Sequence, residues 1–378
     1  MKHLCRPLFV LFAFVMTPLF ASRVWASDHR VAVITGAEQT DAYLKLLKGK
    51  RVALFSNQSG RIGDQLTLDV LLEHHVNVVT VFSPEHGFRG KADAGEKVSS
   101  YVDEPTGVRV FSLYGTAKDA PDDAEMKKID VVVTDIQDVG LRFYTYYITM
   151  MRLMNRCAAC GKEIDGPILD MKYASGVGAL PIPIVHGMTL GELARMVNGE
   201  RWLKSGKRCK LTVIPCKNYT HQTKYDLPVA PSPNLPNMKS IYLYPSLCYF
   251  EATPVSVGRG TDKAFQIFGH PDMKDYAFTF TPESRTGAKN PPLLGKRCYG
   301  RNLTQLSDSA IWARKIDLSY VIEAYHALNL GDRFFTSFFE KLMGVDYVRK
   351  MIEEGKGADE ISQMWQEDVK KFKKKRRK

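Results

Sequence analysis

The stretch "VNVVTVFSPEHGFRG" at residues 76–90 decides the fold. Its first seven residues are almost all apolar and β-branched, which is typical of a strand buried on both faces of a sheet. The run stops abruptly at Ser-Pro-Glu-His-Gly, so Glu85 and His86 come directly after the strand. Because ligands of parallel sheets bind beyond the carboxyl ends of the strands, this stretch predicts both a fold class and the place of a functional site.

Similar apolar runs at 51–57, 108–115 and 130–134 predict further strands, and the leucine spacing of 65–75 and the long run 142–157 predict helices. Strands that alternate with helices predict an α/β domain with a doubly wound, mostly parallel sheet. No glycine-rich phosphate loop follows any of these strands. We therefore expect no nucleotide cofactor.

The second half of the chain predicts a smaller α+β domain. We place the boundary between 175 and 205 and assign residues 27–190 and 191–378 to the two domains. One expected strand is absent after the first long helix, near 161–166. The elements predicted for the second half are a capped helix at 187–200 opened by Thr189 and Glu192, strands at 209–216 and 276–284, a proline-rich and aromatic loop region at 227–265, and helices over 317–374.

Both ends of the chain are basic. Residues 1–26 combine Lys2 and Arg6 with an apolar core and a "VWA" cleavage pattern, which predicts a signal peptide and a periplasmic or secreted protein. A membrane anchor is the alternative, but the apolar run is shorter than the ~20 residues of a span, and we expect no stable membrane insertion. The basic tail 370–378 is interpreted as a solvated helix end, with an anionic surface as its alternative partner.

The formal net charge of +12 comes almost entirely from these ends. The signal peptide carries three positive charges and the tail carries eight, so the body between them is close to neutral and offers no face for nucleic acid. Cys157 and Cys160 form a Cys-x-x-Cys motif, for which redox chemistry is a minor alternative. No second cysteine pair completes a zinc site, and we expect no metal.

Carboxylates at the strand ends are the candidate catalytic groups. Glu85, half-buried among apolar neighbours, can hold a proton and act as a general acid; its alternative is a loop residue that caps the next segment. His86 is either a second acid or base, or a structural histidine. Asp135 and Asp138 follow the strand at 130–134, and one of them could act as a base or stabilise a cationic transition state. For Asp138 the alternative is capping of a helix N-terminus.

Several polar residues would then hold a substrate. Arg259 lies between two glycines and suits a carboxylate, although a structural salt bridge within a tight turn is its alternative. The predicted binding set is completed by its neighbours in "FEATPVSVGRGTD" (250–262), by residues near the two aspartates and by one residue of the rigid loop "APSPNLPN" (230–237): Gln137, Arg142, Tyr144, Asn234, Glu251, Thr253 and Asp262.

Eight ordered motifs resemble the exo-β-N-acetylmuramidase family (NamZ-like, glycoside hydrolase family 171, formerly DUF1343). They run from about residue 40 to the C-terminal region, and together they are far more specific than any one of them. The motifs are "SPEHGFRG", "DAGEKV", "SLYG", "TDIQDVGLRFYTY", "DGPILD", "PIPIVHGMTLGELA", "PSPNLP" and "YPSLCYFEATPVSVGRGTD".

The resemblance implies a Rossmann-like N-terminal domain, a smaller C-terminal domain, and an active site in the cleft between them. It implies removal of N-acetylmuramic acid from non-reducing ends of peptidoglycan fragments, without metal or nucleotide. The family's presumed catalytic glutamate lies in "PEHG" and maps to Glu85. The lactyl carboxylate of muramic acid would suit Arg259 or Arg89, which is our inference.

One departure separates this chain from the resemblance. Family members usually carry a strand ending in Asp-Arg-Pro-Asn-Pro between the long helix and "DGP", and here it is missing. A non-catalytic binding protein for peptidoglycan fragments is therefore the rival hypothesis. A metal-dependent hydrolase using Glu85, His86 and Asp135 is the third. The sequence predicts no oligomeric state.

Overall fold

The computed structural model describes residues 32–90, 92–93, 96, 98–114, 121–154, 164–203, 206, 208–221 and 223–376. The predicted signal peptide and the Cys-x-x-Cys motif lie outside these residues. All elements discussed below belong to one structural unit that begins at Val33. In the part of the chain that is described, no helix has both the length and the apolar character needed to span a bilayer.

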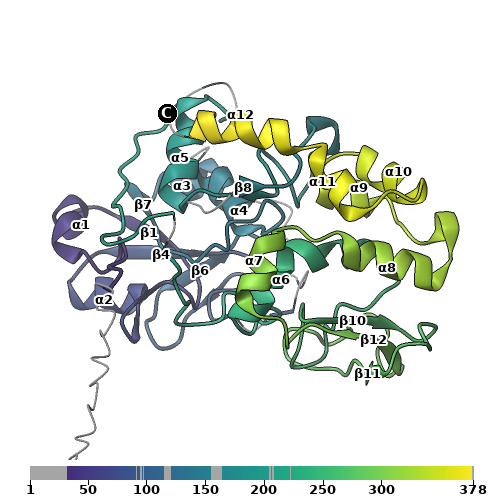
Figure 1. Cartoon of the computed structure of the whole chain (residues 1–378). Helices are drawn as coiled ribbons and strands as arrows, with labels where there is room; N and C mark the ends of the chain where they lie inside the picture. Colours follow the sequence, from purple (N-terminus) through teal and green to yellow (C-terminus); the bar gives the residue numbers. More distant parts are fainter. Residues whose placement is uncertain are drawn as a thin grey trace, which may run out of the picture. The chain divides into compact units, whose positions relative to one another are not determined.

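A five-stranded sheet forms the core of the first half (Figure 1). Four strands are parallel and follow the order β6-β4-β1-β7, while β5 (Tyr101–Val102) pairs antiparallel at one edge. The order reverses between β1 and β7, which creates a topological switch point. The doubly wound, mostly parallel sheet is thus confirmed, with β1 at Val52–Phe55, β4 at Val78–Ser83, β6 at Arg109–Ser112 and β7 at Val131–Thr134.

Both faces of this sheet are covered, which explains the unbroken apolar runs. Within β1, Leu54 packs into the core beneath α1 and α2, and Phe55 packs into the core on the opposite face. Figure 1 shows α2 on one side of the sheet and α4 and α5 on the other. The elements around the sheet are α1 (Thr40–Leu47), β2 (Arg61–Ile62), β3 (Gln65–Leu66), α2 (Thr67–Glu73), α3 (Asp123–Met126), α4 (Tyr146–Met154) and α5 (Leu190–Gly199).

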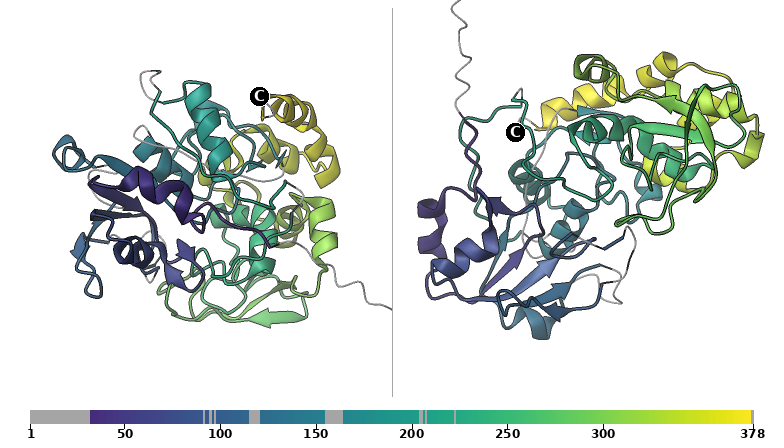
Figure 2. Two further views of the ribbon diagram at one scale, coloured as in Figure 1. Left: turned by 90° about the vertical axis from the view of Figure 1, so that its left-hand side faces the viewer. Right: turned by 90° about the horizontal axis from the view of Figure 1, so that it is seen from below.

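The second half contains a three-stranded antiparallel sheet with the order β10-β12-β11, and many helices. In Figure 2 the green strands of this sheet lie apart from the blue strands of the parallel sheet. The elements here are α6 (Met238–Leu247), η3 (Cys248–Ala252), β10 (Ile267–His270), β11 (Phe278–Phe280), β12 (Cys298–Asn302), α7 (Asp308–Arg314), α8 (Ser319–Leu328), η4 (Gly331–Arg333), α9 (Phe338–Met343), α10 (Tyr347–Glu353), α11 (Ala358–Gln363) and α12 (Gln366–Arg376).

Two local predictions need correction. The strand expected at 209–216 does not form, and only an isolated bridge between Ile34 and Lys217 follows it. The basic tail is not merely a solvated end, because α12 buries Phe372 against the fold. Near the end of α12, Lys375 lies over the Trp202 ring at 4.9 Å and pairs with Glu200 beside α5. The basic tail therefore serves as a packing element.

The region of the missing strand lies partly outside the described residues. Its described part, β8 (Ile164–Asp165), pairs antiparallel with β9 (Val185–His186) and not with the parallel sheet. Among the described strands, β7 pairs only with β1 and is therefore an edge. A short 3-10 helix, η1 (Met171–Tyr173), follows β8.

Arg142 joins the two halves of the chain from within the core. Its guanidinium is fully buried and donates to four backbone carbonyls, among them Leu342 and Met343 at the C-terminal end of α9. The other two carbonyls belong to Pro167 and Ile182, at 2.7 and 3.0 Å. Burial lowers the pKa of Arg142 to about 10, so it stays charged at neutral pH. The buried side chain thus serves the fold, and its geometry does not support the predicted role of Arg142 in binding substrate.

Replacement of this buried cation tests its structural role. Arg142→Met should lower the free energy of unfolding by about 3–5 kcal/mol, because four buried carbonyls lose their donor. Arg301→Met is the matched control, since Arg301 pairs with Glu323 at the surface, and it should cost less than about 1 kcal/mol. Urea denaturation of both variants measures the difference. Equal costs would contradict the structural role of Arg142.

Candidate active site

Glu85 emerges from the carboxyl end of β4, as the sequence predicts. Its side chain is half-buried, and its Oε2 accepts a hydrogen bond of 2.9 Å from the hydroxyl of Thr145, directly before α4. The buried hydroxyl of Tyr146 lies within reach of its charge: burial raises the pKa of Tyr146, and the Glu85 carboxylate adds to that increase. Glu85 therefore lies on the α4 side of the sheet.

His86 fastens two loops together. The residue is buried, with a left-handed backbone (φ 71°), and both of its ring nitrogens have partners. Nδ1 is 2.7 Å from the carbonyl of Ala92, and Nε2 is 3.2 Å from the hydroxyl of Ser232. The structural alternative therefore accounts for this histidine, and its geometry does not support the predicted acid or base role.

The loop at 230–234 is the meeting point of several strand-end loops. The carbonyl of Pro231 accepts the hydroxyls of Tyr144 and Tyr146, at 2.9 and 3.2 Å. It also accepts the side-chain amide of Gln58, which follows β1, at 3.3 Å. His86, in the loop after β4, binds the neighbouring Ser232. The loops after β1, β4 and β7 therefore all form hydrogen bonds with this one short segment. Tyr144, predicted to bind substrate, is buried and holds this loop.

Asn234 links the loop at 230–234 to a later part of the chain by a further hydrogen bond. It is buried, and its amide nitrogen donates to the carbonyl of Gly287 at 2.8 Å. Nearby, the backbone and side-chain nitrogens of Lys289 bind Asp93 and Glu96, at 2.9 and 3.1 Å. The side chain of Asn234 thus serves the fold, in contrast to its predicted role in binding substrate.

Asp135 and Asp138 diverge after β7. The carboxylate of Asp135 accepts the hydroxyl of Thr67 at the start of α2, and its charge acts on Tyr43 of α1. Burial raises the pKa of Asp135 to about 6, although the Thr67 hydrogen bond opposes this. Its contacts therefore lie on the α1 and α2 side of the sheet, whereas Glu85 contacts the start of α4.

Asp138 lies in the turn that follows β7. Its charge, like that of Glu85, adds to the effect of burial on the pKa of Tyr146. Its Oδ1 accepts the backbone N–H of Gly140 at 2.6 Å, which forms a local turn rather than a helix cap. Gln137 donates its side-chain amide to the Asp138 carbonyl at 2.5 Å, so it shapes this turn. Because the Asp135 carboxylate pairs with Thr67 on the α2 side of the sheet, we take Asp138 as the better candidate partner for Glu85.

Sequence reasoning missed the residues that support this turn. The backbone N–H of Gln137 donates to the hydroxyl of Ser59 at 2.9 Å, and Asn57 accepts that hydroxyl's proton at 2.6 Å. Both residues follow β1 at the switch point, and Thr145 was also overlooked. Ligand sites of parallel sheets form where the strand order reverses, which here is beside β1. This rule would have indicated the loop after β1, but the sequence does not reveal the order of the strands.

The predicted binding residues of the second half form their own cluster. Arg259 donates from Nε to Glu251 at 2.8 Å and pairs with the same carboxylate through a second nitrogen, so the predicted salt-bridge alternative is present. The hydroxyl of Thr253 donates to the Phe250 carbonyl at 2.9 Å, while Asp262 is exposed. The arginine is only 18% exposed, and the cluster is largely self-contained.

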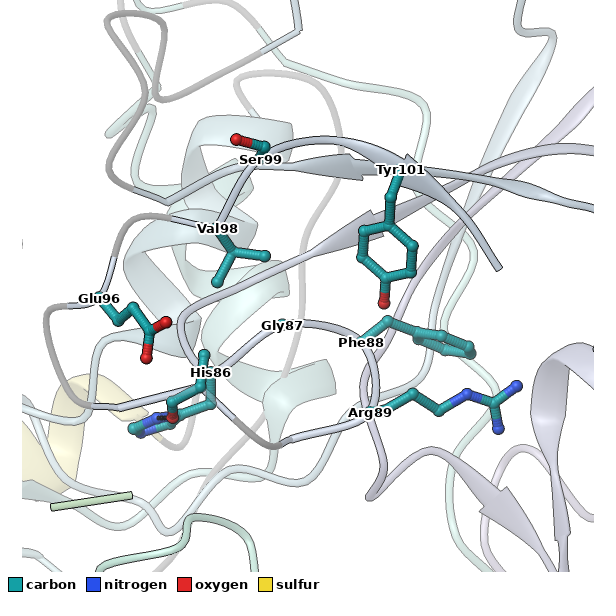
Figure 3. A pocket seen from close by; sticks show the side chains of 9 residues that line it. His86, Gly87, Phe88, Arg89, Glu96, Val98, Ser99 and Tyr101 are labelled. Atoms are coloured by element: carbon teal, nitrogen blue, oxygen red, sulfur yellow. Dashed lines mark hydrogen bonds between the residues drawn. The ribbon is translucent and has the colours of Figure 1, made fainter. Parts of the chain in front are cut away.

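A cavity of about 530 Å³ opens beside the Glu85 loop (Figure 3). Arg89 lines it and is held by two hydrogen bonds to the buried Asp103, at 3.0 and 2.8 Å. In Figure 3, Arg89 and Tyr101 lie on one side of the cavity and Glu96 on the other. The full lining consists of His86, Gly87, Phe88, Arg89, Ala92, Glu96, Val98, Ser99 and Tyr101.

The three ligands of the metal-dependent alternative do not converge. His86 uses both nitrogens within the protein, and Asp135 contacts α1 and α2 rather than the α4 side where Glu85 lies. Within the described ranges, no group of three or more histidine, cysteine, aspartate or glutamate side chains could hold a metal ion. The geometry therefore gives this alternative no support.

Comparison with known proteins yields matches along nearly the whole chain. The N-terminal model of the exo-β-N-acetylmuramidase NamZ family matches residues 52–239, and its C-terminal model matches 242–378. These models meet later than the domain boundary predicted from the sequence. The peptidoglycan β-N-acetylmuramidase NamZ of Bacillus subtilis (strain 168) is 37% identical over 369 residues, which cover 89% of this chain and 88% of that protein.

Two crystal structures of DUF1343 family proteins from Bacteroides fragilis NCTC 9343 share the fold. One is 60% identical, with a TM-score of 0.85, and the match covers 92% of this chain and 98% of that one. The other is 27% identical, with a TM-score of 0.75, and covers 91% and 97%. Both likenesses extend over the two halves of the chain, so its two-domain α/β architecture is confirmed.

The raised pKa of Asp135 implies that the free energy of unfolding depends on pH. Because the folded state holds this proton up to about pH 6 and the unfolded chain only to about 3.8, the contribution of Asp135 to stability should fall as the pH rises from 4 to 6. Asp135→Asn removes this titration, so relative to wild type it should gain up to about 3 kcal/mol across that range. Urea denaturation at several pH values measures the gain.

The control for this measurement is Asp130→Asn. Asp130 is exposed, and its hydrogen bonds to Arg51 lower its pKa to about 2, so its protonation does not change between pH 4 and 7. A pH-independent difference between wild type and Asp135→Asn would contradict the raised pKa of Asp135.

Proposed function

The chain belongs to the NamZ family of exo-β-N-acetylmuramidases, and we propose that it releases N-acetylmuramic acid from non-reducing ends of peptidoglycan fragments. The observation that carries this proposal is the placement of Glu85. It stands at the carboxyl end of a central parallel strand, where the hydroxyl of Thr145 at the start of α4 holds its carboxylate. Export through the predicted signal peptide would bring the enzyme to its polymer.

Hydrolysis of a glycosidic bond requires two carboxyl groups with different roles. Glu85 would donate a proton to the glycosidic oxygen as that oxygen leaves C1 of the muramic acid residue. Asp138 would stabilise the positive charge that develops on the sugar ring, or activate the group that attacks it. Since Asp138 is fixed by the Gly140 N–H, its carboxylate needs little reorganisation during the reaction.

Of the two candidate arginines for the lactyl carboxylate, Arg89 is better placed. It lines the cavity beside the Glu85 loop, and its side chain is 34% exposed. Arg259 is more deeply buried against Glu251. Asp103 fixes the Arg89 guanidinium, which would present it to a ligand in one orientation. The exposed ring of Tyr101 in the lining suits the apolar face of a sugar ring.

The non-catalytic alternative remains testable with a single substrate. Wild-type protein should release free N-acetylmuramic acid from a MurNAc–GlcNAc disaccharide, and Glu85→Gln should lose at least about 10³-fold in kcat while its Kd stays within about threefold. Glu104→Gln, on an exposed loop, is the control and should match wild type. Binding without release by the wild type would favour the binding protein.

An activated substrate assigns the role of Glu85. An aryl β-N-acetylmuraminide with a good leaving group needs no proton, so Glu85→Gln should regain most of its rate on it if Glu85 is the general acid. Loss of both activities would instead make Glu85 the nucleophile or base.

The two aspartates should differ in kinetics. Asp138→Asn should lower kcat on the disaccharide by about 10²-fold or more, because it removes the second charge beside Tyr146. Asp135→Asn should leave kcat within about threefold, since its carboxylate pairs with Thr67 at the start of α2. Steady-state kinetics of both variants measures the contrast. The assignment of Asp138 fails if the Asp135 variant is the more damaged one.

A further inference from the structure

Thr145 both begins α4 with its backbone and binds Glu85 with its side chain. It directly precedes α4, and its carbonyl accepts the N–H groups of Ile148 and Thr149, at 3.1 and 3.2 Å, which opens the helix. A threonine at a helix N-cap ordinarily uses its side-chain oxygen to accept a backbone N–H of the first turn. Here the hydroxyl donates its proton to Oε2 of Glu85, at 2.9 Å.

The neighbours of Thr145 hold it rigidly in place. Tyr144 and Tyr146 are both buried, and both donate to the carbonyl of Pro231. Because the residues on either side are fixed to one acceptor, the backbone of Thr145 has little freedom. The direction of its hydroxyl toward Glu85 is therefore set by the fold, as preorganised positioning requires.

We propose that Thr145 is a positioning residue that decides which oxygen of Glu85 carries the proton. This rests on the proposed function of the chain. A hydroxyl that donates to Oε2 disfavours a proton on that same oxygen, so the acid proton resides on Oε1. In the reaction the proton passes from Oε1 to the glycosidic oxygen, which takes the electron pair of its bond to C1. By the end of the reaction the oxygen of a water molecule is bonded to C1, and one proton of that water has returned to a carboxylate of the site. Thr145 then stabilises the resulting carboxylate at Oε2.

The competing interpretation is that Thr145 only caps α4. The two interpretations predict different kinetics. A cap affects stability, and its loss costs about 1 kcal/mol without dependence on the substrate. A positioning role affects the proton transfer alone, so its loss should matter for a poor leaving group and hardly at all for a good one.

The chain offers a matched control for the experiment. Thr67 also stands at the start of a helix, α2, and its hydroxyl also donates to a carboxylate that follows a parallel strand, that of Asp135. Thr145→Val and Thr67→Val therefore remove the same hydroxyl from the same kind of pair, one on each side of the sheet. Thr145→Ser keeps the hydroxyl and serves as the rescue variant.

We expect Thr145→Val to lower kcat on MurNAc–GlcNAc by about 10- to 100-fold with KM within about threefold. On the aryl β-N-acetylmuraminide the loss should shrink to about threefold or less. Thr145→Ser and Thr67→Val should stay within about threefold of wild type on both substrates. Circular dichroism and thermal melting of each variant establish that it is folded.

Three outcomes overturn the proposal. Equal losses for Thr145→Val on the two substrates would reduce Thr145 to a structural residue, and so would a Thr145→Ser variant as slow as Thr145→Val. Should Thr145→Val not fold, the leaving-group comparison is made with Thr145→Ser and Thr145→Ala.

Failure of this inference can be distinguished from failure of the proposed function. A wild type that releases no muramic acid would refute the proposed function itself, whereas an active wild type with an equally active Thr145→Val refutes only this inference.

Discussion

The carbonyl oxygen of Pro231 is the acceptor on which the candidate site depends. A buried carbonyl needs a donor, and a buried tyrosine hydroxyl needs an acceptor. Here two tyrosines and Gln58 meet both requirements at one atom, while His86 binds the residue that follows. These hydrogen bonds fix the loops after three parallel strands relative to each other, and Glu85 belongs to the loop after β4.

The same requirement explains why several predicted binding residues proved structural. Loops at the ends of strands expose many backbone carbonyls, and buried ones must be satisfied. Arg142 serves four such carbonyls, and Asn234 serves one. Side chains with many donors are favoured at these places for the fold as well as for ligands. Residue type alone therefore does not separate the two uses.

The second half of the chain completes the first through side chains as well as through loops. Arg142 reaches the end of α9, and α12 returns to contact Glu200 and Trp202 beside α5. The basic residues of the tail thus take part in packing. A chain shortened before α12 would lose Phe372 and expose the apolar residues against which it packs.

The sequence by itself determined the parallel sheet, because continuous apolar runs such as 76–82 occur only where both faces are buried, and it determined that Glu85 stands at a strand's carboxyl end. It could not rank Asp135 against Asp138, which are three residues apart and chemically alike. Only the tertiary structure separates them: after β7 the Asp135 carboxylate accepts the hydroxyl of Thr67, whereas Asp138 accepts the N–H of Gly140 within its own turn. The role of Thr145 depends likewise on β4 and α4 meeting in space, and local sequence carries no record of a contact between residues 60 positions apart.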